Sequence, residues 1–276
     1  MRARFQDKPT VIRLADGSVV GYRVPATLVD QQLMHVEPLE KWAAEFSQSL
    51  PRTGDEKRGI ACVRRYARWV KYNKDGKLEL SADYRRDGVV AERFMEASNL
   101  LWRRADQWFP RHYHGKAYRD LSCCSLNPGE EKLCGPWMGC AVNVAVDRKP
   151  VETKPHRDIQ GFLHGMSCLC PFGKFTGGGL VLWELEMVVE LKRGDLFFFM
   201  DHLINHSNEE AQGMRHSVVA FTENKVWRRT AEANGFEDAR VRAFRKASKR
   251  FREERKEKGR EKKKHKIDIR AIETSV

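Results

Sequence analysis

Apolar and polar residues follow two different periods along the chain, and the first is that of short strands. Residues 11–14 and 19–22 are rich in β-branched and apolar residues and flank Asp16-Gly17, which favours the tight turn of a β-hairpin. Over residues 28–50 the apolar positions recur at steps of three and four, the period of an amphipathic helix. We expect that helix to start or break near Pro38.

The clearest helical pattern covers residues 88–109 and is stopped by Pro110. We expect the apolar stripe of this helix to pack in the hydrophobic core. The stripe consists of Val90, Phe94, Ala97, Leu101, Ala105 and Trp108. Residues 111–138 show neither period and contain Asn127-Pro128-Gly129, a turn signal. An irregular segment is therefore predicted there.

Strand-like alternation returns in residues 139–222. Ala141, Asn143 and Ala145 would share one face of a strand, because side chains of a strand alternate. Gly177-Gly178-Gly179 predicts a turn with positive φ angles or a close backbone approach. Further strands are predicted over residues 161–170, 180–185, 187–191 and 196–200.

A segment of mixed aromatic and basic residues has two interpretations. Aromatic rings interleaved with arginines can stack on bases and contact phosphates. The alternative is an amphipathic segment whose aromatic rings pack inward while its basic groups stay solvated. The segment contains Arg64, Arg65, Tyr66, Arg68, Trp69, Val70, Lys71 and Tyr72.

A length of 276 residues is enough for one large domain or two small ones with a sizeable core. Residues 1–8 are charged and lack the apolar stretch of a secretory signal. No apolar run approaches the length that crosses a bilayer. We therefore expect an intracellular protein, nuclear or cytoplasmic, that is neither secreted nor embedded in a membrane.

The chain has seven cysteines, and reduced thiols are the default interpretation for an intracellular protein. A structural zinc site is an alternative, although the spacing lacks the paired C-x2-C knuckles of zinc modules. Its ligands would come from His112, His114, Cys123, Cys124, Cys134 and Cys140. Cys168 and Cys170 are interpreted as packing residues.

Positive charge is concentrated near the C-terminus. Residues 240–266 hold fifteen Lys and Arg against four Glu, a local net of +11 out of +13 for the whole chain. Such a tail fits attraction to a phosphate backbone, a nuclear-localisation signal or a merely solvated segment. The first part carries a thin apolar stripe and is predicted to be helical, and the part after Gly259 to be disordered.

The chemistry-bearing residues lie between positions 139 and 222. His156 and Asp158 are two apart, so on one extended strand both side chains would point to the same face. His206 can supply a third ligand if the strands fold back on each other. Two histidines and one carboxylate leave other positions of a metal open, which suits non-haem Fe(II) oxygenases. A purely structural His–Asp pair is the alternative.

Arg215 and Ser217 follow nine and eleven residues after His206. Arg215 is a planar, permanently charged fork suited to holding a carboxylate. Ser217 would lie on the same strand face, where its hydroxyl can share that carboxylate.

These motifs carry a family resemblance. The run His156-x-Asp158, the glycine-rich turn, Gly194-Asp195, His206 and Arg215-x-Ser217 resembles the Fe(II)- and 2-oxoglutarate-dependent dioxygenases. The surrounding sequence is similar to the fungal group related to the TET and J-base-binding-protein oxygenases. The segments that carry this second similarity are residues 153–158, 175–180 and 215–222.

The resemblance implies an α+β fold: a double-stranded β-helix, or jelly roll, buttressed by N-terminal helices and followed by a basic C-terminal helix and tail. We expect one dioxygenase domain over residues 1–235. Within it, residues 1–135 would be a mainly helical support region and residues 136–225 the catalytic core. Residues 236–276 would form the tail.

The resemblance also implies a reaction. His156, Asp158 and His206 would hold Fe(II), with His202 the rival for the last ligand, and Arg215 and Ser217 would hold 2-oxoglutarate. In related enzymes a residue at the place of Asn143 often faces the co-substrate. With O2, such a site hydroxylates a C–H bond and releases succinate and CO2.

A methylated or methyl-bearing base in DNA or RNA is the first choice of substrate, and the basic tail would bind the nucleic acid. The alternatives are a hydroxylase of a protein side chain or small molecule, and a non-catalytic jelly-roll binding protein.

Overall fold

The structure is a computed structural model, and it divides the chain into two compact units, residues 1–227 and 228–276. It describes residues 2–3, 7–48, 55–56, 59–60, 62–70, 78–122, 132–145, 151–163 and 165–233. Several predictions fall outside these residues: the helical and then disordered tail, the turn at Asn127-Pro128-Gly129, and Cys123 and Cys124 of the alternative zinc site.

The helices are α1 (Ala26–Val29), α2 (Glu37–Gln48), α3 (Ala82–Asp87), α4 (Val89–Trp108), α5 (Arg111–Ser122), α6 (Asn224–Ala233) and the 3-10 turn η1 (Trp183–Leu185). The two predicted amphipathic helices are confirmed as α2 and α4. The stripe of α4 is partly wrong, because Trp102 is buried and Val90 is 36% exposed. No helix among the described residues is long and apolar enough to cross a membrane.

The prediction of an irregular segment over 111–138 is wrong for its first part, which is α5. Its apolar positions are sparse, since only Ala117 and Leu121 of this helix are buried. The backbone leaves helical geometry at His114, whose ring nitrogen Nε2 lies 2.9 Å from the carbonyl oxygen of Val19. The kink interrupts the period by which a helix is recognised in sequence.

Eight strands form the larger sheet, in the order β2-β3-β13-β9-β16-β8-β6-β7. They are β2 (Thr10–Arg13), β3 (Val19–Val24), β6 (Cys62–Val70), β7 (Leu78–Leu80), β8 (Gly139–Val144), β9 (Ser167–Phe172), β13 (Leu196–Phe199) and β16 (His216–Phe221). The predicted hairpin is confirmed as β2 and β3. The N-terminal region therefore does more than cover the sheet, since it supplies β2, β3, β6 and β7.

A second sheet has the order β1-β12-β11-β14. It consists of β1 (Arg2–Ala3), β12 (Met187–Val189), β11 (Leu180–Leu182) and β14 (His206–Asn208). Two small antiparallel pairs complete the strands: β10 (Phe175–Gly177) with β15 (Ala211–Gly213), and β4 (Asp55–Glu56) with β5 (Gly59–Ile60). Gly177 and Gly178 have positive φ angles, as the glycine turn predicted.

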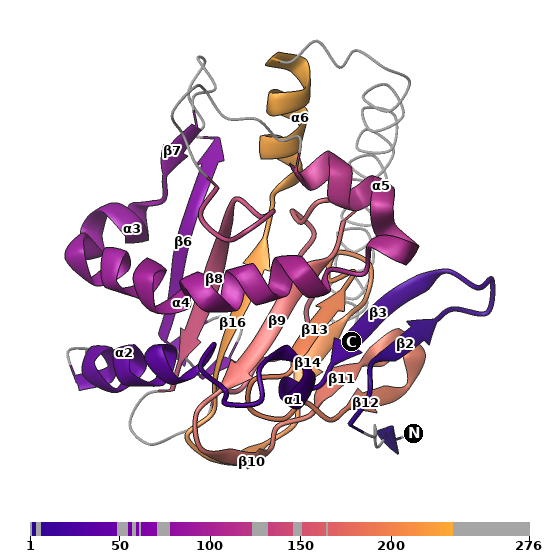
Figure 1. Ribbon diagram of the computed structural model, residues 1–276, viewed down its shortest axis with the longest axis horizontal. Helices are drawn as coiled ribbons and strands as arrows, with labels where there is room; N and C mark the ends of the chain where they lie inside the picture. Colours follow the sequence, from indigo (N-terminus) through magenta and orange to yellow (C-terminus); the bar gives the residue numbers. More distant parts are fainter. Residues whose placement is uncertain are drawn as a thin grey trace, which may run out of the picture. The chain divides into compact units, whose positions relative to one another are not determined.

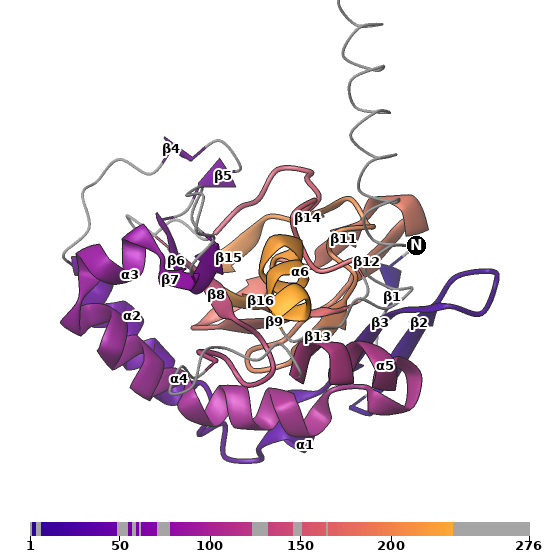
Figure 2. The ribbon, with the colours of Figure 1, turned by 90° about the horizontal axis from the view of Figure 1, so that it is seen from above.

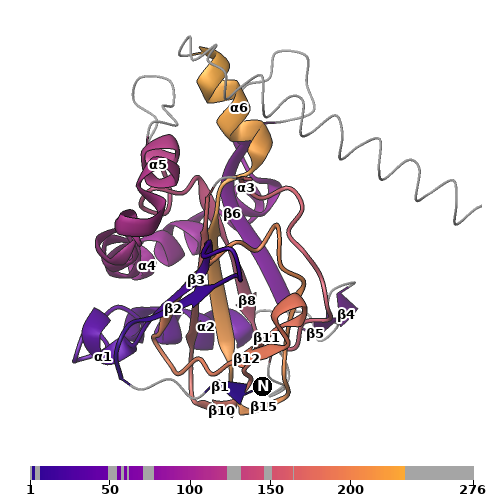
Figure 3. The ribbon, with the colours of Figure 1, turned by 90° about the vertical axis from the view of Figure 1, so that its right-hand side faces the viewer.

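Within the first unit the helices cover one face of the eight-stranded sheet, and β11 and β12 lie on its other side (Figures 2 and 3). Strands β6, β8, β16, β9 and β13 run side by side behind α2 and α4 (Figure 1). Phe197 and Phe199 fill the space between the sheets together with Leu180 and Val189. Two apposed, mainly antiparallel sheets with helices on one face confirm the expected α+β jelly roll.

The aromatic-basic segment is strand β6, and its two faces have different roles. Arg64 and Tyr66 face the helices: the Tyr66 ring lies 5.2 Å from that of Phe94, and the Arg64 guanidinium pairs with Asp87 at 3.0 Å. The inward packing of Tyr66 agrees with the amphipathic interpretation. Arg65 points to the opposite face, because strand side chains alternate, and there it lines a pocket.

Candidate metal centre and its pocket

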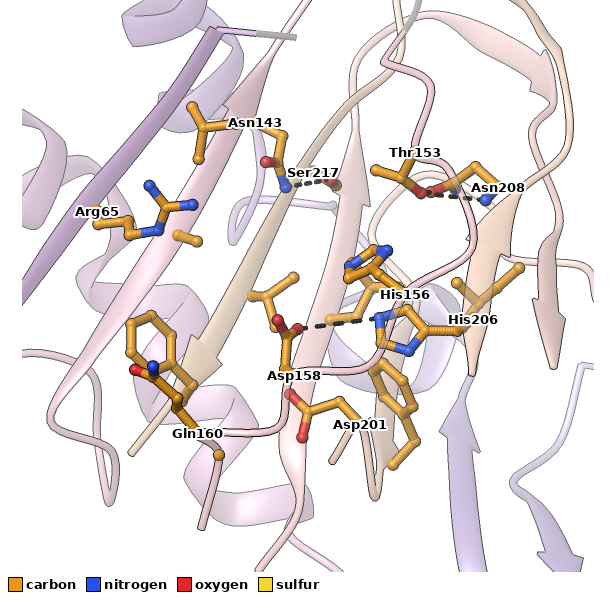
Figure 4. Close-up of a pocket in the computed structure, with 18 of the residues that line it drawn as sticks. Arg65, Asn143, Thr153, His156, Asp158, Gln160, Asp201, His206, Asn208 and Ser217 are labelled. Carbon is orange, nitrogen blue, oxygen red and sulfur yellow. Dashed lines mark hydrogen bonds and ion pairs between the residues drawn. The ribbon is translucent and has the colours of Figure 1, made fainter. Parts of the chain in front are cut away.

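The structure brings His156, Asp158 and His206 together: one ligand atom of each lies within 4.8 Å of the others. Nε2 of His206 is 3.9 Å from Oδ2 of Asp158, and the two imidazole rings are 4.4 Å apart (Figure 4). This is the one group of three or more potential metal ligands among the described residues. His202, the rival ligand, is buried outside it.

Backbone hydrogen bonds hold the two histidines in register. The His156 N–H donates to the His206 carbonyl at 3.0 Å, and the His206 N–H donates back at 2.9 Å. His206 belongs to β14, but His156 sits in an irregular segment that pairs with β14 at this isolated bridge and contacts it again between Thr153 and Asn208. The prediction that His156 and Asp158 share a regular strand is therefore wrong, although both side chains reach the same site.

Each histidine directs one particular nitrogen toward the site. Nδ1 of His156 lies 2.7 Å from the carbonyl oxygen of Lys154, and Nδ1 of His206 lies 3.0 Å from that of Ile204. A carbonyl can only accept, so Nδ1 carries the proton in both rings. The lone pair then remains on Nε2, which is the arrangement that a metal-binding histidine needs.

These residues fit a metal ion on geometric grounds. Metal bonds to imidazole nitrogen and carboxylate oxygen are about 2.0–2.2 Å long, so two ligands of one ion lie at most about 4.4 Å apart. The 3.9 Å between His206 and Asp158 is within that limit. With three protein ligands, an ion held here would have positions left for ligands that enter through the pocket.

A second carboxyl group, Asp201, lies beside the three ligands and is almost fully buried. Burial, with the nearby charge of Asp158, raises the pKa of Asp201 well above its ordinary value. Its backbone carbonyl accepts a hydrogen bond from the Asp158 N–H at 3.1 Å. Asp201 therefore fixes the backbone beneath Asp158.

The ligands open into a pocket of about 320 Å³ between the two sheets, at the lower end of small-molecule sites. Both sheets line it, with Leu169 and Val219 from the larger and Leu180 and His206 from the smaller. Apolar side chains form part of its walls, and the polar groups between them are contacts for a bound molecule.

Two of the predicted co-substrate residues meet on the pocket wall. Asn143 and Ser217 are directly opposite each other in the register of β8 and β16, and both line the pocket. Nδ2 of Asn143 donates to Oγ of Ser217 at 3.1 Å, which leaves the amide oxygen and the hydroxyl proton for other partners (Figure 4).

Arg215 lies behind this wall and is fully buried. Its guanidinium faces the side-chain amide of Asn208, which lines the pocket. A guanidinium can only donate, so the facing amide atom is the oxygen, and it accepts at 2.8 and 3.0 Å. Burial lowers the pKa of Arg215 to about 10, which still leaves it charged at neutral pH.

No carboxylate of the described residues pairs with Arg215, and its buried Nε has no hydrogen-bond partner there. Leaving a buried charge unmatched costs stability, so the surroundings fit an anion that arrives with a ligand.

Of the remaining cysteine and histidine candidates, those that the structure describes do not join a group of three or more potential metal ligands. Cys134 and Cys140 are buried, and burial raises the pKa of Cys134 well above its ordinary value. His112 and His114 lie on α5, where His114 is held by Val19. Cys168 and Cys170 are fully buried, as packing residues are.

No protein-family model and no curated protein matches the sequence. Among solved structures, NgTET1 in complex with 5mC DNA is similar over 82% of this chain and 79% of that chain, with 19% identity and a TM-score of 0.57. The chain has the fold of the 2-oxoglutarate/Fe(II) oxygenases. The expected resemblance is thereby confirmed at the level of the fold.

Two further solved structures match with lower TM-scores. A 2OG-Fe(II) oxygenase-family oxidoreductase from Burkholderia pseudomallei has 14% identity and a TM-score of 0.40, over 73% of this chain and 84% of that one. A Pseudomonas putida prolyl-4-hydroxylase has 13% identity and a TM-score of 0.39, over 73% and 90%.

Several residues that line the pocket were not predicted from the sequence. Asn208 is two positions after His206 on β14, so strand alternation alone places both on one face. Arg65 and Glu223 line the far part of the pocket, but they come from segments distant in sequence and only the folded register joins them.

Proposed function

We propose that this protein is an Fe(II)- and 2-oxoglutarate-dependent oxygenase that hydroxylates a methyl-bearing pyrimidine base in nucleic acid. The observation that carries the proposal is the group of His156, Asp158 and His206 at the base of a pocket in an oxygenase fold. Bound Fe(II), 2-oxoglutarate and O2 together supply the chemistry: one oxygen atom enters a substrate C–H bond, and the other ends in succinate as CO2 leaves.

The chain's own residues bind and orient. His156, Asp158 and His206 hold the metal by Nε2, a carboxylate oxygen and Nε2, and the two backbone carbonyls fix the imidazole tautomers. Arg215 provides the charge for the distal carboxylate of 2-oxoglutarate, with the Ser217 hydroxyl and the Asn143 amide at the wall beside it.

The nucleic-acid substrate rests on two supports. The sequence is similar around its metal ligands to TET-related oxygenases, and NgTET1, whose fold it shares, was solved with 5mC DNA. The basic segment of residues 240–266 adds a sequence-independent attraction to phosphates. A base within a duplex must be rotated out of the stack to reach such a pocket.

The test is mass spectrometry of DNA oligonucleotides that contain 5-methylcytosine or thymine, incubated with protein, Fe(II), ascorbate and 2-oxoglutarate, with succinate followed in parallel. We expect one added oxygen on a base, lost in His156→Ala and kept in His112→Ala, a surface histidine. If succinate forms but no base is altered, the substrate would instead be a protein side chain or a small molecule. If the protein forms no succinate and binds no metal, the alternative of a non-catalytic jelly-roll binding protein would be supported.

The tail needs a separate experiment. Removing residues 236–276 should weaken DNA binding and its salt dependence while leaving succinate formation intact. Unchanged DNA binding would mean that the tail is not the phosphate contact.

A further inference from the structure

Beyond the metal ligands, the pocket continues to an end lined by two charged side chains, Arg65 and Glu223. Arg65 comes from β6, and Glu223 follows the last residue of β16 by two positions. Figure 4 shows Arg65 and Gln160 on the side of Asp158 away from His206. In the same view Asn208 lies on the other side of His156 and Asp158 from Arg65, so the Arg65 end is separate from the wall in front of Arg215.

The sheet register explains why Arg65 is there. Arg65 pairs with Ala141, Ala141 pairs with Val219, and Val219 pairs with Leu169, so these four side chains form one row across the pocket face. Its three partners are short or apolar and offer the guanidinium nothing to bind. Arg65 makes no side-chain hydrogen bond or ion pair with any residue that the structure describes, whereas Arg64 on the other face pairs with Asp87.

Glu223 is in a similar position. It is held at the pocket by an antiparallel bridge to Gly161, next to Gln160. Its carboxyl group has no hydrogen bond or ion pair within the described part of the chain, and Arg65 acts on it only at longer range. Burial raises the pKa of Glu223 above its ordinary value, against the opposing charges of Lys225 and Arg65.

Two unpartnered polar groups in a partly buried cleft favour a ligand edge that carries both an acceptor and a donor. A guanidinium only donates, so it needs an acceptor, and a carboxyl group needs at least one donor. A hydrocarbon satisfies neither group, a cation satisfies only Glu223, and an anion satisfies only Arg65. A neutral, planar ring edge with a carbonyl and an amino group satisfies both.

We propose that Arg65 and Glu223 are specificity-determining residues that read the polar edge of a cytosine-type base, with Arg65 bound to the ring carbonyl O2 and Glu223 to the exocyclic amino group. Carboxylate side chains accept from the cytosine N4 amino group; a good bidentate base contact discriminates by about 1–3 kcal/mol, or roughly 5- to 150-fold, and a single contact is expected near the lower end. The inference rests on the proposed function and narrows it from pyrimidines to 5-methylcytosine.

The matched substrates are two short single-stranded oligonucleotides that differ only in one base, 5-methylcytosine or thymine. Both rings carry the same methyl group and the same O2, and they differ at N3 and C4. Wild-type protein with Fe(II) and 2-oxoglutarate should bind the 5-methylcytosine strand at least about 5-fold more tightly without O2, and oxidise it in preference when both strands compete in air.

Three substitutions separate the roles. Glu223→Leu should remove the preference by weakening 5-methylcytosine binding. Glu223→Gln should narrow the preference by strengthening thymine binding, because an amide can both donate to O4 and accept from N3–H. Arg65→Met should weaken the binding of both oligonucleotides by a similar factor, because both bases present O2. Glu210→Gln and Arg93→Met, at exposed positions away from the pocket, are the charge-matched controls.

The outcomes are distinguishable from those of the proposed function. If wild-type protein oxidises 5-methylcytosine and the Glu223 variants keep the same base preference, the inference is wrong and the proposed function stands. Loss of thermal stability with an unchanged preference would make Arg65 and Glu223 a structural pair. If no base is oxidised while succinate still forms with another substrate, both proposals fail.

Discussion

The side-chain oxygen of Asn208 accepts two hydrogen bonds from the buried guanidinium of Arg215, at 2.8 and 3.0 Å. The amide nitrogen of Asn208 donates on its other side to Oγ1 of Thr153, 2.7 Å away, in the segment that leads to His156. One amide thus connects the expected carboxylate anchor with the segment that carries two metal ligands. It is also the polar group that a bound carboxylate would meet first.

Asn208→Asp should weaken the affinity for 2-oxoglutarate more than Asn208→Ala does. The aspartate places a permanent carboxylate against Arg215, and charge-assisted hydrogen bonds are about twice as strong as neutral ones. We expect a rise in Kd of about 10-fold or more for the Asp variant, measured by titration calorimetry with Mn(II) present. Asn99→Asp on the exposed face of α4 is the control for charge. If the Asn208→Asp and Asn208→Ala variants bind 2-oxoglutarate with equal affinity, Arg215 is not the carboxylate anchor.

Gly178→Ala should also disturb Arg215, through a contact that does not involve Asn208. Gly178 has a φ of +67°, and a Cβ there would lie 2.7 Å from Cδ and 2.9 Å from Nε of Arg215. Gly17, at +84° with open space around it, is a matched control. Both alanine variants should lose about 1–2 kcal/mol of unfolding free energy from left-handed backbone strain. Only Gly178→Ala should also bind 2-oxoglutarate more weakly.

The metal group was predictable from sequence because its residue types are scarce and their order is informative. The order of the motifs alone indicates His156, Asp158 and His206, and the fold brings their ligand atoms together. The strand expected for His156 was wrong because its segment pairs with β14 at an isolated bridge, and an isolated bridge leaves no alternating pattern in the sequence.

The substrate end of the pocket could not be predicted in the same way. Arg65 looked like one of several basic residues on an amphipathic segment, and nothing local distinguishes it from Arg64. The distinction arises from alternation on β6 once pairing with β8 fixes which face meets the pocket. Helix α5 was missed for a related reason, since its kink at His114 breaks the helical period.

Removal of a metal ligand should abolish stabilisation by metal. A metal at about 100 times its Kd raises the unfolding free energy of the wild type by about 2.7 kcal/mol. His156→Ala, Asp158→Ala and His206→Ala should show no rise in Tm on addition of Mn(II). His202→Ala, the buried neighbour outside the group, should keep the rise in Tm even if its own baseline is lower. If Mn(II) raises the Tm of His206→Ala but not that of His202→Ala, then His202 and not His206 is the metal ligand.

His216 should make the fold sensitive to acid. Its Nδ1 accepts a hydrogen bond from the Ala145 N–H at 3.0 Å, which requires a neutral ring. Burial lowers the pKa of His216 to about 4, from an ordinary 6.5; the charge of Glu40 opposes that shift, and the charge of Arg215 adds to it. Between these two values the unfolded chain binds the proton and the folded chain does not, so stability falls as the pH drops from about 6.5 to about 4.

The contribution of His216 over that range is on the order of 3 kcal/mol. His216→Asn isolates it, because the asparagine Oδ1 can take the place of Nδ1 as acceptor and does not titrate. Urea unfolding at pH 7.5 and pH 4.5 should therefore show a smaller loss of stability for the Asn variant than for the wild type. A loss of equal size in both proteins would place the acid sensitivity in other groups.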